Sequence, residues 1–315
     1  MAGGSCVLLP AFFHVLRQLK ARGRSFSVCF RTFGTDLAKV AAEFNAMCEG
    51  RHPLFALEQT IVLDGSDGGR DYRMSLTDGQ PGCGTWLRDA EGTLSLLIGT
   101  IEQPKLEAAG GQAMRDAYTG RTDLTLLEGA QAARDHLRAV LHTAGAGVTL
   151  ALRDYYPGWN ATGCKAAGGK PLLLEDDDPT LLQIFFDDHV LLTDAHIVDV
   201  RRASDLTGPP LPIAAVLDIH LIRAEPLRSI AERSYFLDAV SRAEANWRSG
   251  WRRRRALAEA LADFSELMAK LAATSVAAAS GAPRQYVPHA RTAAVALATD
   301  ADTFDEADGA GGDES

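Results

Sequence analysis

The chain has 315 residues, 46% of them hydrophobic, and a formal net charge of −9. Its hydrophobic content is sufficient for a sizeable core, and its acidic balance argues against general affinity for nucleic acid or anionic membranes. The five cysteines are widely spaced and form no C-x-x-C pair, so we expect neither a disulfide framework nor a zinc site, and a reducing, cytoplasmic location fits best.

The first fifty residues predict a helix, a strand, a turn and a second helix. Residues 8–22 carry apolar side chains at helical spacing, and no window of the chain reaches the roughly 18 apolar residues of a transmembrane helix. A strand-like run over residues 25–30 leads to Thr32, and a helix follows from Leu37. In a parallel sheet Thr32 would end its strand beside a helix N-terminus that can seat a phosphate, although a simple turn or capping role for Thr32 remains open.

Residues 51–105 differ in character from what precedes them. Short β-type runs over residues 59–63, 72–76, 85–87 and 94–101 are separated by glycine-rich turns. Strands joined by such turns indicate an antiparallel hairpin or meander rather than parallel units. We therefore expect this β-rich segment to be an insertion or cap.

The helical pattern returns over residues 124–142, and a strand over residues 148–152 follows. Lys170, held between a glycine and a proline, is interpreted as a positioned lysine, with a chance surface location as the alternative. The apolar run 181–190 contains Asp187 and Asp188, which we place at the C-terminal end of a buried strand, where ligands of α/β sheets usually bind. Two adjacent carboxylates favour a hard cation such as Mg²⁺, or else form a solvated turn.

Two further β runs are expected at residues 196–201 and 213–221, before a helical region over residues 226–279. Within that region the basic cluster Arg252–Arg255 is either a solvated helix face or a contact for anionic lipid at a membrane surface or for nucleic acid. The acidic composition of residues 280–315 predicts a disordered tail.

Together these elements predict an α/β protein with a Rossmann-like parallel sheet and flanking helices. The core would be discontinuous, over residues 1–50 and 106–225, interrupted by the β-rich insertion and followed by the C-terminal helices and the tail.

Three short motifs, in this order, resemble the second, third and fourth motifs of the haloacid dehalogenase-like superfamily. They are Phe30-Arg31-Thr32, Gly169-Lys170-Pro171 and Phe185-Phe186-Asp187-Asp188. The resemblance implies that Thr32 and Lys170 contact the transferring phosphoryl group and that Asp187 and Asp188 hold Mg²⁺. It also implies a phosphorylated small molecule as the substrate.

The nucleophilic aspartate of that family should precede Thr32, yet residues 1–31 contain no Asp or Glu. Three explanations are open: a gene model that begins too late, a true pseudoenzyme, or an accidental resemblance. We therefore expect a phosphatase or hydrolase of this superfamily, or a remnant of one, that is inactive as written. The alternative is a non-catalytic phosphate-ligand or protein-interaction module on the same fold.

Overall fold

The computed structural model describes residues 6–53, 62–89, 91–103, 116–118, 120–143, 149–176, 178–193 and 196–250, with residues 267, 268 and 270. All labelled helices and strands belong to the first of two compact units, residues 1–257. Among the described helices, none has both the length and the apolar character needed to cross a membrane.

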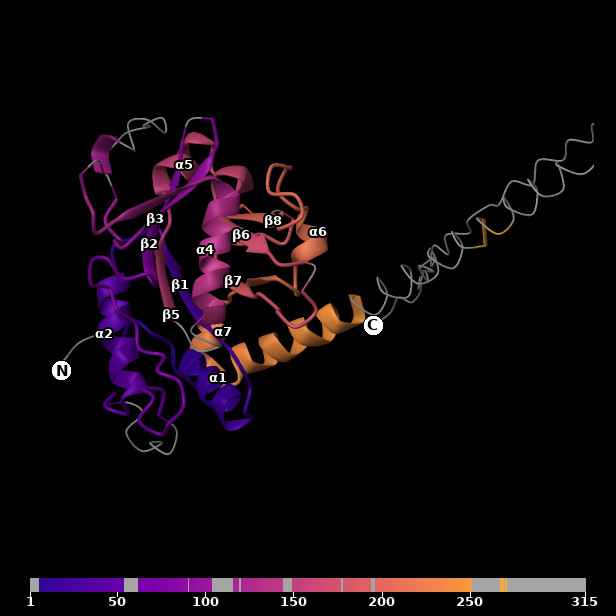
Figure 1. Cartoon of the computed structure of the whole chain (residues 1–315). Coiled ribbons are helices and arrows are strands. Elements are labelled where there is room, and N and C mark those ends of the chain that lie inside the picture. The colour runs from indigo at the N-terminus through magenta and orange to yellow at the C-terminus, as the bar shows by residue number, and fades with distance from the viewer. Residues whose placement is uncertain are drawn as a thin grey trace, which may run out of the picture. The chain divides into compact units, whose positions relative to one another are not determined.

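A five-stranded sheet forms the centre of this unit, in the order β1-β5-β2-β3-β4 (Figure 1). The first three are parallel: β1 (Val28–Thr32), β5 (Thr149–Arg153) and β2 (Cys83–Arg88). The outer strands β3 (Leu94–Ile98) and β4 (Thr125–Glu128) are antiparallel. The predicted α/β class, with a largely parallel sheet and flanking helices, is therefore confirmed.

Helices cover both faces of this sheet, because its interior strands carry apolar residues at consecutive positions, which point to opposite faces. Ala151 of β5 packs in a cluster with α1 (Pro10–Ala21) and α2 (Leu37–Cys48). Its neighbour Leu152 points the other way, into a cluster with Ala133 of α4 (Gly129–Thr143). Figure 1 shows α2 and α4 on opposite sides of the strands.

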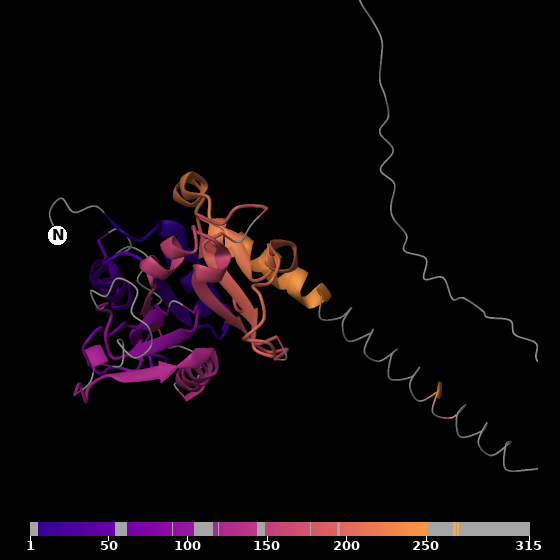
Figure 2. The same ribbon diagram turned by 90° about the horizontal axis from the view of Figure 1, so that it is seen from above.

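Two short parallel pairs complete the described strands. They are β6 (Lys170–Leu174) with β8 (Val198–Arg202), and β7 (Phe185–Asp187) with β9 (Leu221–Arg223). The remaining short elements are α5 (Tyr156–Ala161), η2 (Ala166–Gly168), α6 (Ile213–Val216) and α7 (Pro226–Ala231). A helix over residues 235–250, orange in Figure 2, packs on α1 through the edge-to-face contact of Phe236 with Phe12.

The β-rich segment does contain an antiparallel hairpin, β2 with β3, but this hairpin is not a separate cap. Strand β2 pairs in parallel with β5, so the expected insertion is part of the central sheet. All six residues of β2 are buried, as in an interior strand, and Gly84 lies so close to the carbonyl of Leu97 that a Cβ would be 2.8 Å from it.

Four other predicted elements were wrong in type or extent. Residues 72–76 form no strand, and the predicted helix 124–142 begins with strand β4, so that α4 starts only at Gly129. The run 213–221 divides into α6 and the start of β9, and the run 181–190 contributes only β7. Short apolar runs do not distinguish a strand from a buried helical turn, which is why periodicity failed here. Of the predicted helical region 226–279, α7 and residues 235–250 are helical. Residues 251–279, apart from 267, 268 and 270, lie outside the described residues, as do the Arg252–Arg255 cluster within them and the acidic tail.

Candidate functional site

Thr32 is the last residue of β1, as predicted. Its Oγ1 accepts a hydrogen bond of 2.9 Å from the backbone N–H of Gly34, and its carbonyl accepts one of 2.7 Å from the N–H of Asp154. These bonds fix the turn from β1 into α2 and tie it to the end of β5. The hydroxyl of Thr32 therefore has a structural role in this turn.

A cleft of about 280 Å³ opens at this edge of the sheet, on the side of α2. Its lining residues are Gly34, Thr35, Leu37, Ile101, Glu102 and Arg153. Asp36 occupies the N-cap position of α2 without a side-chain capping bond, so the first amides of the helix keep their positive character. Arg153 adds a full positive charge, and its Nε is buried with no hydrogen-bond partner among the residues that the structure describes. This end of the cleft is suited to an anion.

Lys170 and Asp187 form a direct ion pair near the ends of β1 and β5, on the face of the sheet opposite the cleft. The Lys170 Nζ lies 2.7 Å from Asp187 Oδ2, and both side chains are more than 90% buried. Lys170 is the first residue of β6 rather than a loop residue, and its ammonium group also lies 5.1 Å from the centre of the Phe33 ring. That ring stacks on Trp159, with the two ring centres 5.4 Å apart.

A second ion pair adjoins the first. Arg31 of β1 donates from Nε to Asp154 Oδ2 at 3.0 Å and binds the other carboxylate oxygen through Nη2. Its Nη1 donates to the carbonyl of Pro171, next to Lys170. Arg31, Asp154, Lys170 and Asp187 are called the Asp187 cluster below. Their two positive and two negative charges balance.

Burial by itself would lower the pKa of Arg31. The attraction of the Asp154 carboxylate opposes this effect, and the pKa of Arg31 is raised above its ordinary value. Arg31 is therefore charged throughout the accessible pH range. Asp154 is fully buried, so losing Arg31 would leave an unpaired carboxylate in the interior.

Asp188 lies outside the cluster and is half exposed, with its Oδ1 2.9 Å from the Nδ1 of His189. One ligand atom from each of Asp187, Asp188 and His189 lies within 4.8 Å of the others, close enough to share a cation. Asp187 Oδ2 is occupied by Lys170, and Oδ1 already accepts the N–H of His189. The residues fit a hard cation held mainly by Asp188, Asp187 Oδ1 and water.

The structure brings Lys170 and Asp187 together and places Thr32 at the adjacent strand end. Thr32 does not join them through its side chain, because neighbouring residues of a strand point to opposite faces. Arg31 is aligned with Leu152 on the α4 side, whereas Thr32 is aligned with Arg153 on the cleft side. Lys170 and Asp187 thus belong to the Asp187 cluster and Asp188 lies beside it, whereas Thr32 lies on the cleft side of β1 without being one of the lining residues.

Sequence reasoning missed Arg31, Phe33, Arg153 and Asp154 as members of these sites. The signal was present in part, because both β1 and β5 are apolar strands whose final residues become charged. What the sequence lacked was the parallel pairing of β1 with β5, which aligns the two strand ends.

Fold and site together define an α/β protein with a buried charge cluster at the carboxyl ends of parallel strands. Comparison of the chain with protein-family models, with curated proteins and with solved structures gave no match in any of the three.

Proposed function

We propose that the chain is a haloacid dehalogenase-like protein that binds a phosphorylated small molecule and Mg²⁺ without completing hydrolysis. The observation that carries the proposal is the 2.7 Å ion pair between Lys170 and Asp187, residues expected from sequence to act together. This ion pair lies beside the end of β1. Arg31 of β1 connects the two, because it donates to the carbonyl of Pro171, next to Lys170, and pairs with Asp154. A phosphate site and a cation site would then share one edge of the sheet.

In this proposal the phosphate group occupies the cleft. The first amides of α2, the hydroxyl of Thr35 and the guanidinium of Arg153 would bind its oxygens. Asp188 and Asp187 Oδ1 would hold Mg²⁺ largely through water, while the ion pair with Lys170 holds the Asp187 carboxylate in place. Glu102 also lines the cleft, and its negative charge would oppose the ligand.

Binding without turnover is favoured by the state of the carboxylates. Covalent phosphoryl transfer needs an aspartate free to attack phosphorus, whereas Asp154 is held by Arg31 and Asp187 by Lys170. The site would therefore supply recognition and electrostatic stabilisation, and not the covalent step.

The direct test is calorimetric titration of the full chain with a panel of phosphate monoesters in the presence of Mg²⁺. Arg153→Gln should weaken the binding of a monoester about tenfold or more, because a charge-assisted contact is lost. Glu102→Gln should strengthen it several-fold by removing repulsion. Arg121→Gln is the matched control, since Arg121 is a half-exposed arginine outside the cleft that pairs with Asp123. Equal affinities for Arg153→Gln and Arg121→Gln would refute the cleft as the phosphate site.

The metal arm of the test uses Mg²⁺ alone and follows thermal unfolding. Mg²⁺ should raise the melting temperature of the wild-type chain, and Asp188→Asn should abolish that increase. Hydrolysis of any monoester, abolished by Asp187→Ala, would show that the site is catalytic after all. Absence of both monoester binding and Mg²⁺ stabilisation would favour the protein-interaction module instead.

A further inference from the structure

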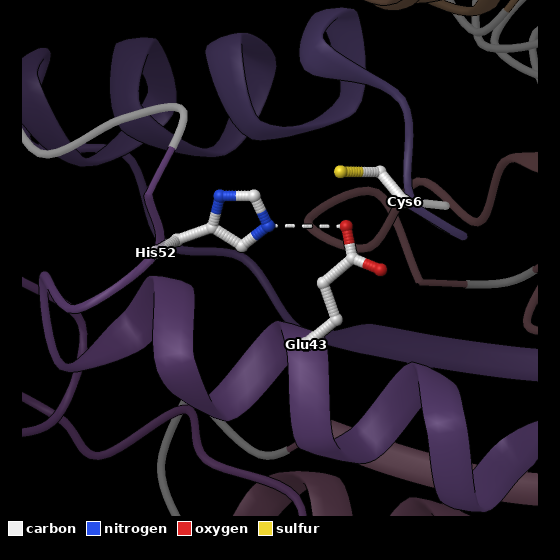
Figure 3. Close-up of side chains that lie close together, drawn as sticks. All are labelled: Cys6, Glu43 and His52. Atoms are coloured by element: carbon white, nitrogen blue, oxygen red, sulfur yellow. Dashed lines mark hydrogen bonds and ion pairs between the residues drawn. The ribbon is translucent and has the colours of Figure 1, made fainter. Parts of the chain in front are cut away.

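A second group of potential metal ligands lies apart from the strand ends. Cys6 precedes α1, Glu43 lies on α2, and His52 follows α2, yet one ligand atom of each lies within 4.8 Å of the others. Figure 3 shows the three side chains converging, with the Glu43 carboxylate facing the His52 ring and the Cys6 sulfur beside both. These three residues are called the Glu43 cluster.

Packing fixes two of the three side chains. Glu43 and His52 are 8% and 1% exposed, and His52 Nε2 lies 3.1 Å from Glu43 Oε1. The Phe13 ring lies 5.3 Å from the His52 ring and helps to orient it. The backbone N–H of Val7 donates to Glu43 Oε2 at 2.7 Å, which positions the carboxylate and brings the neighbouring Cys6 over it.

We propose that Cys6, Glu43 and His52 bind a divalent transition metal of the Zn²⁺ class. Thiolate sulfur, carboxylate oxygen and imidazole nitrogen are the three ligand types that Zn²⁺ prefers in proteins. A thiolate and a carboxylate together neutralise the charge of the ion, and within the described residues neither lysine nor arginine pairs with Glu43 to compete for it.

The spacing of the ligand atoms suits such an ion. With metal–ligand distances of about 2.0–2.3 Å, the ligands of a tetrahedral zinc site lie roughly 3.3–3.7 Å apart. The three atoms here lie within 4.8 Å of one another, so movements of about 1 Å would bring them to that spacing. Val7 holds Oε2 from outside, and Oε1 would exchange its present contact with His52 Nε2 for a bond to the metal. Cys6 is exposed, so water can enter from solvent as the fourth ligand.

The same residue types could instead form a nucleophilic Cys–His pair, but their arrangement opposes this. His52 Nε2 is engaged by Glu43 Oε1 at 3.1 Å, and the Cys6 thiol hydrogen-bonds to the Glu43 carboxylate, so the carboxylate lies between the two groups in the hydrogen-bond network and no direct thiol–imidazole pair is formed. Partial burial and the nearby Glu43 carboxylate also raise the pKa of the Cys6 thiol, the reverse of what an activated thiolate requires.

The test is titration of the metal-free full chain with Co²⁺, which gives a thiolate-to-cobalt charge-transfer absorption only when a cysteine is a ligand. The wild-type chain should show this band at one ion per chain, and Zn²⁺ should displace it. Cys6→Ser should abolish the band, and His52→Gln should weaken Zn²⁺ binding about a hundredfold or more. Circular dichroism of each variant confirms that the helices remain.

Cys164→Ser is the matched control, because Cys164 is a partly exposed cysteine that lies outside the Glu43 cluster. It should keep the full band. The proposal is overturned if the wild-type chain gives no charge-transfer band, or if Cys6→Ser retains it. Since Asp187, Asp188 and His189 contain no sulfur, a metal bound there cannot produce the signal, and failure of either site is recognised separately.

Discussion

The Asp187 cluster and the Glu43 cluster both enclose buried carboxylates, but they neutralise them differently. In the Asp187 cluster each acid has its own cation, Lys170 for Asp187 and Arg31 for Asp154. In the Glu43 cluster the partners are a thiol, an imidazole and a backbone N–H. A buried carboxylate that is paired with a lysine or arginine destabilises the fold when that partner is removed. A buried carboxylate without such a partner can instead stabilise the fold by binding a metal ion.

The largest expected effect follows from removing a built-in cation. Lys170→Met should lower the free energy of unfolding by about 3–5 kcal/mol, because it leaves the Asp187 carboxylate buried and unpaired. Urea unfolding at neutral pH measures the change. The double variant Lys170→Met, Asp187→Leu should recover most of the loss, since no charge then remains buried.

Lys165→Met is the control for this experiment, because Lys165 is an exposed lysine a few residues away. Its cost should stay within about 0.5 kcal/mol, as for most surface substitutions. If Lys170→Met costs no more than Lys165→Met, the cluster does not depend on its own cation and the contrast with Glu43 fails.

A smaller effect is expected from Glu43→Gln, and only when metal is present. At a free Zn²⁺ concentration about a hundred times the dissociation constant, binding should stabilise the wild-type chain by about 2.7 kcal/mol. Glu43→Gln should lose nearly all of this gain while costing only about 1 kcal/mol in chelator, because the amide can still hydrogen-bond to its neighbours. Thermal unfolding with Zn²⁺ and with chelator separates the two contributions. Equal gains for both proteins would remove Glu43 from the metal site.

The smallest effect concerns Cys48, which lies on α2 five residues after Glu43 and is fully buried. Burial, reinforced by nearby carboxylates, raises the pKa of its thiol well above the ordinary value of 9.0. As pH rises, the Cys48 thiol therefore loses its proton in the unfolded chain before it does so in the folded chain. Its contribution to the free energy of unfolding is fully present below about pH 9 and is lost as pH rises further. Between pH 9 and pH 10 the loss should be about 1 kcal/mol.

Cys48→Ala should remove this part of the pH dependence while lowering stability at neutral pH through the cavity that it leaves. Unfolding free energies measured at several alkaline pH values give the slope. A slope unchanged by the substitution would mean that the Cys48 thiol ionises equally in the folded and unfolded chain.

Local sequence pattern predicted those parts of the fold in which one segment carries the whole signal. The apolar spacing in α1 and α2 predicted both helices, and the change from apolar to polar residues placed Thr32 at the end of β1. It failed for β2, because a hairpin pattern is the same whether the hairpin stands alone or pairs with β5.

The candidate sites divide in the same way. Lys170 was singled out because it lies between a glycine and a proline, and Asp187 because it ends an apolar run. The order of their motifs along the chain indicated that the two residues act together, and they form an ion pair in the structure. Cys6, Glu43 and His52 have no common spacing in the sequence, and the widely spaced cysteines argued against a zinc site.

The sequence by itself determined the α/β class, the positions of the main helices and the identity of the charged residues at the strand ends, because propensity and periodicity are local properties. Only the tertiary structure decided which face each side chain occupies. Strand pairing sets the register, and the register sends Arg31 and Thr32 of one strand end to opposite sides of the sheet. Packing of α1 on α2 likewise brings Cys6 to Glu43, a contact between distant segments that neither segment specifies alone.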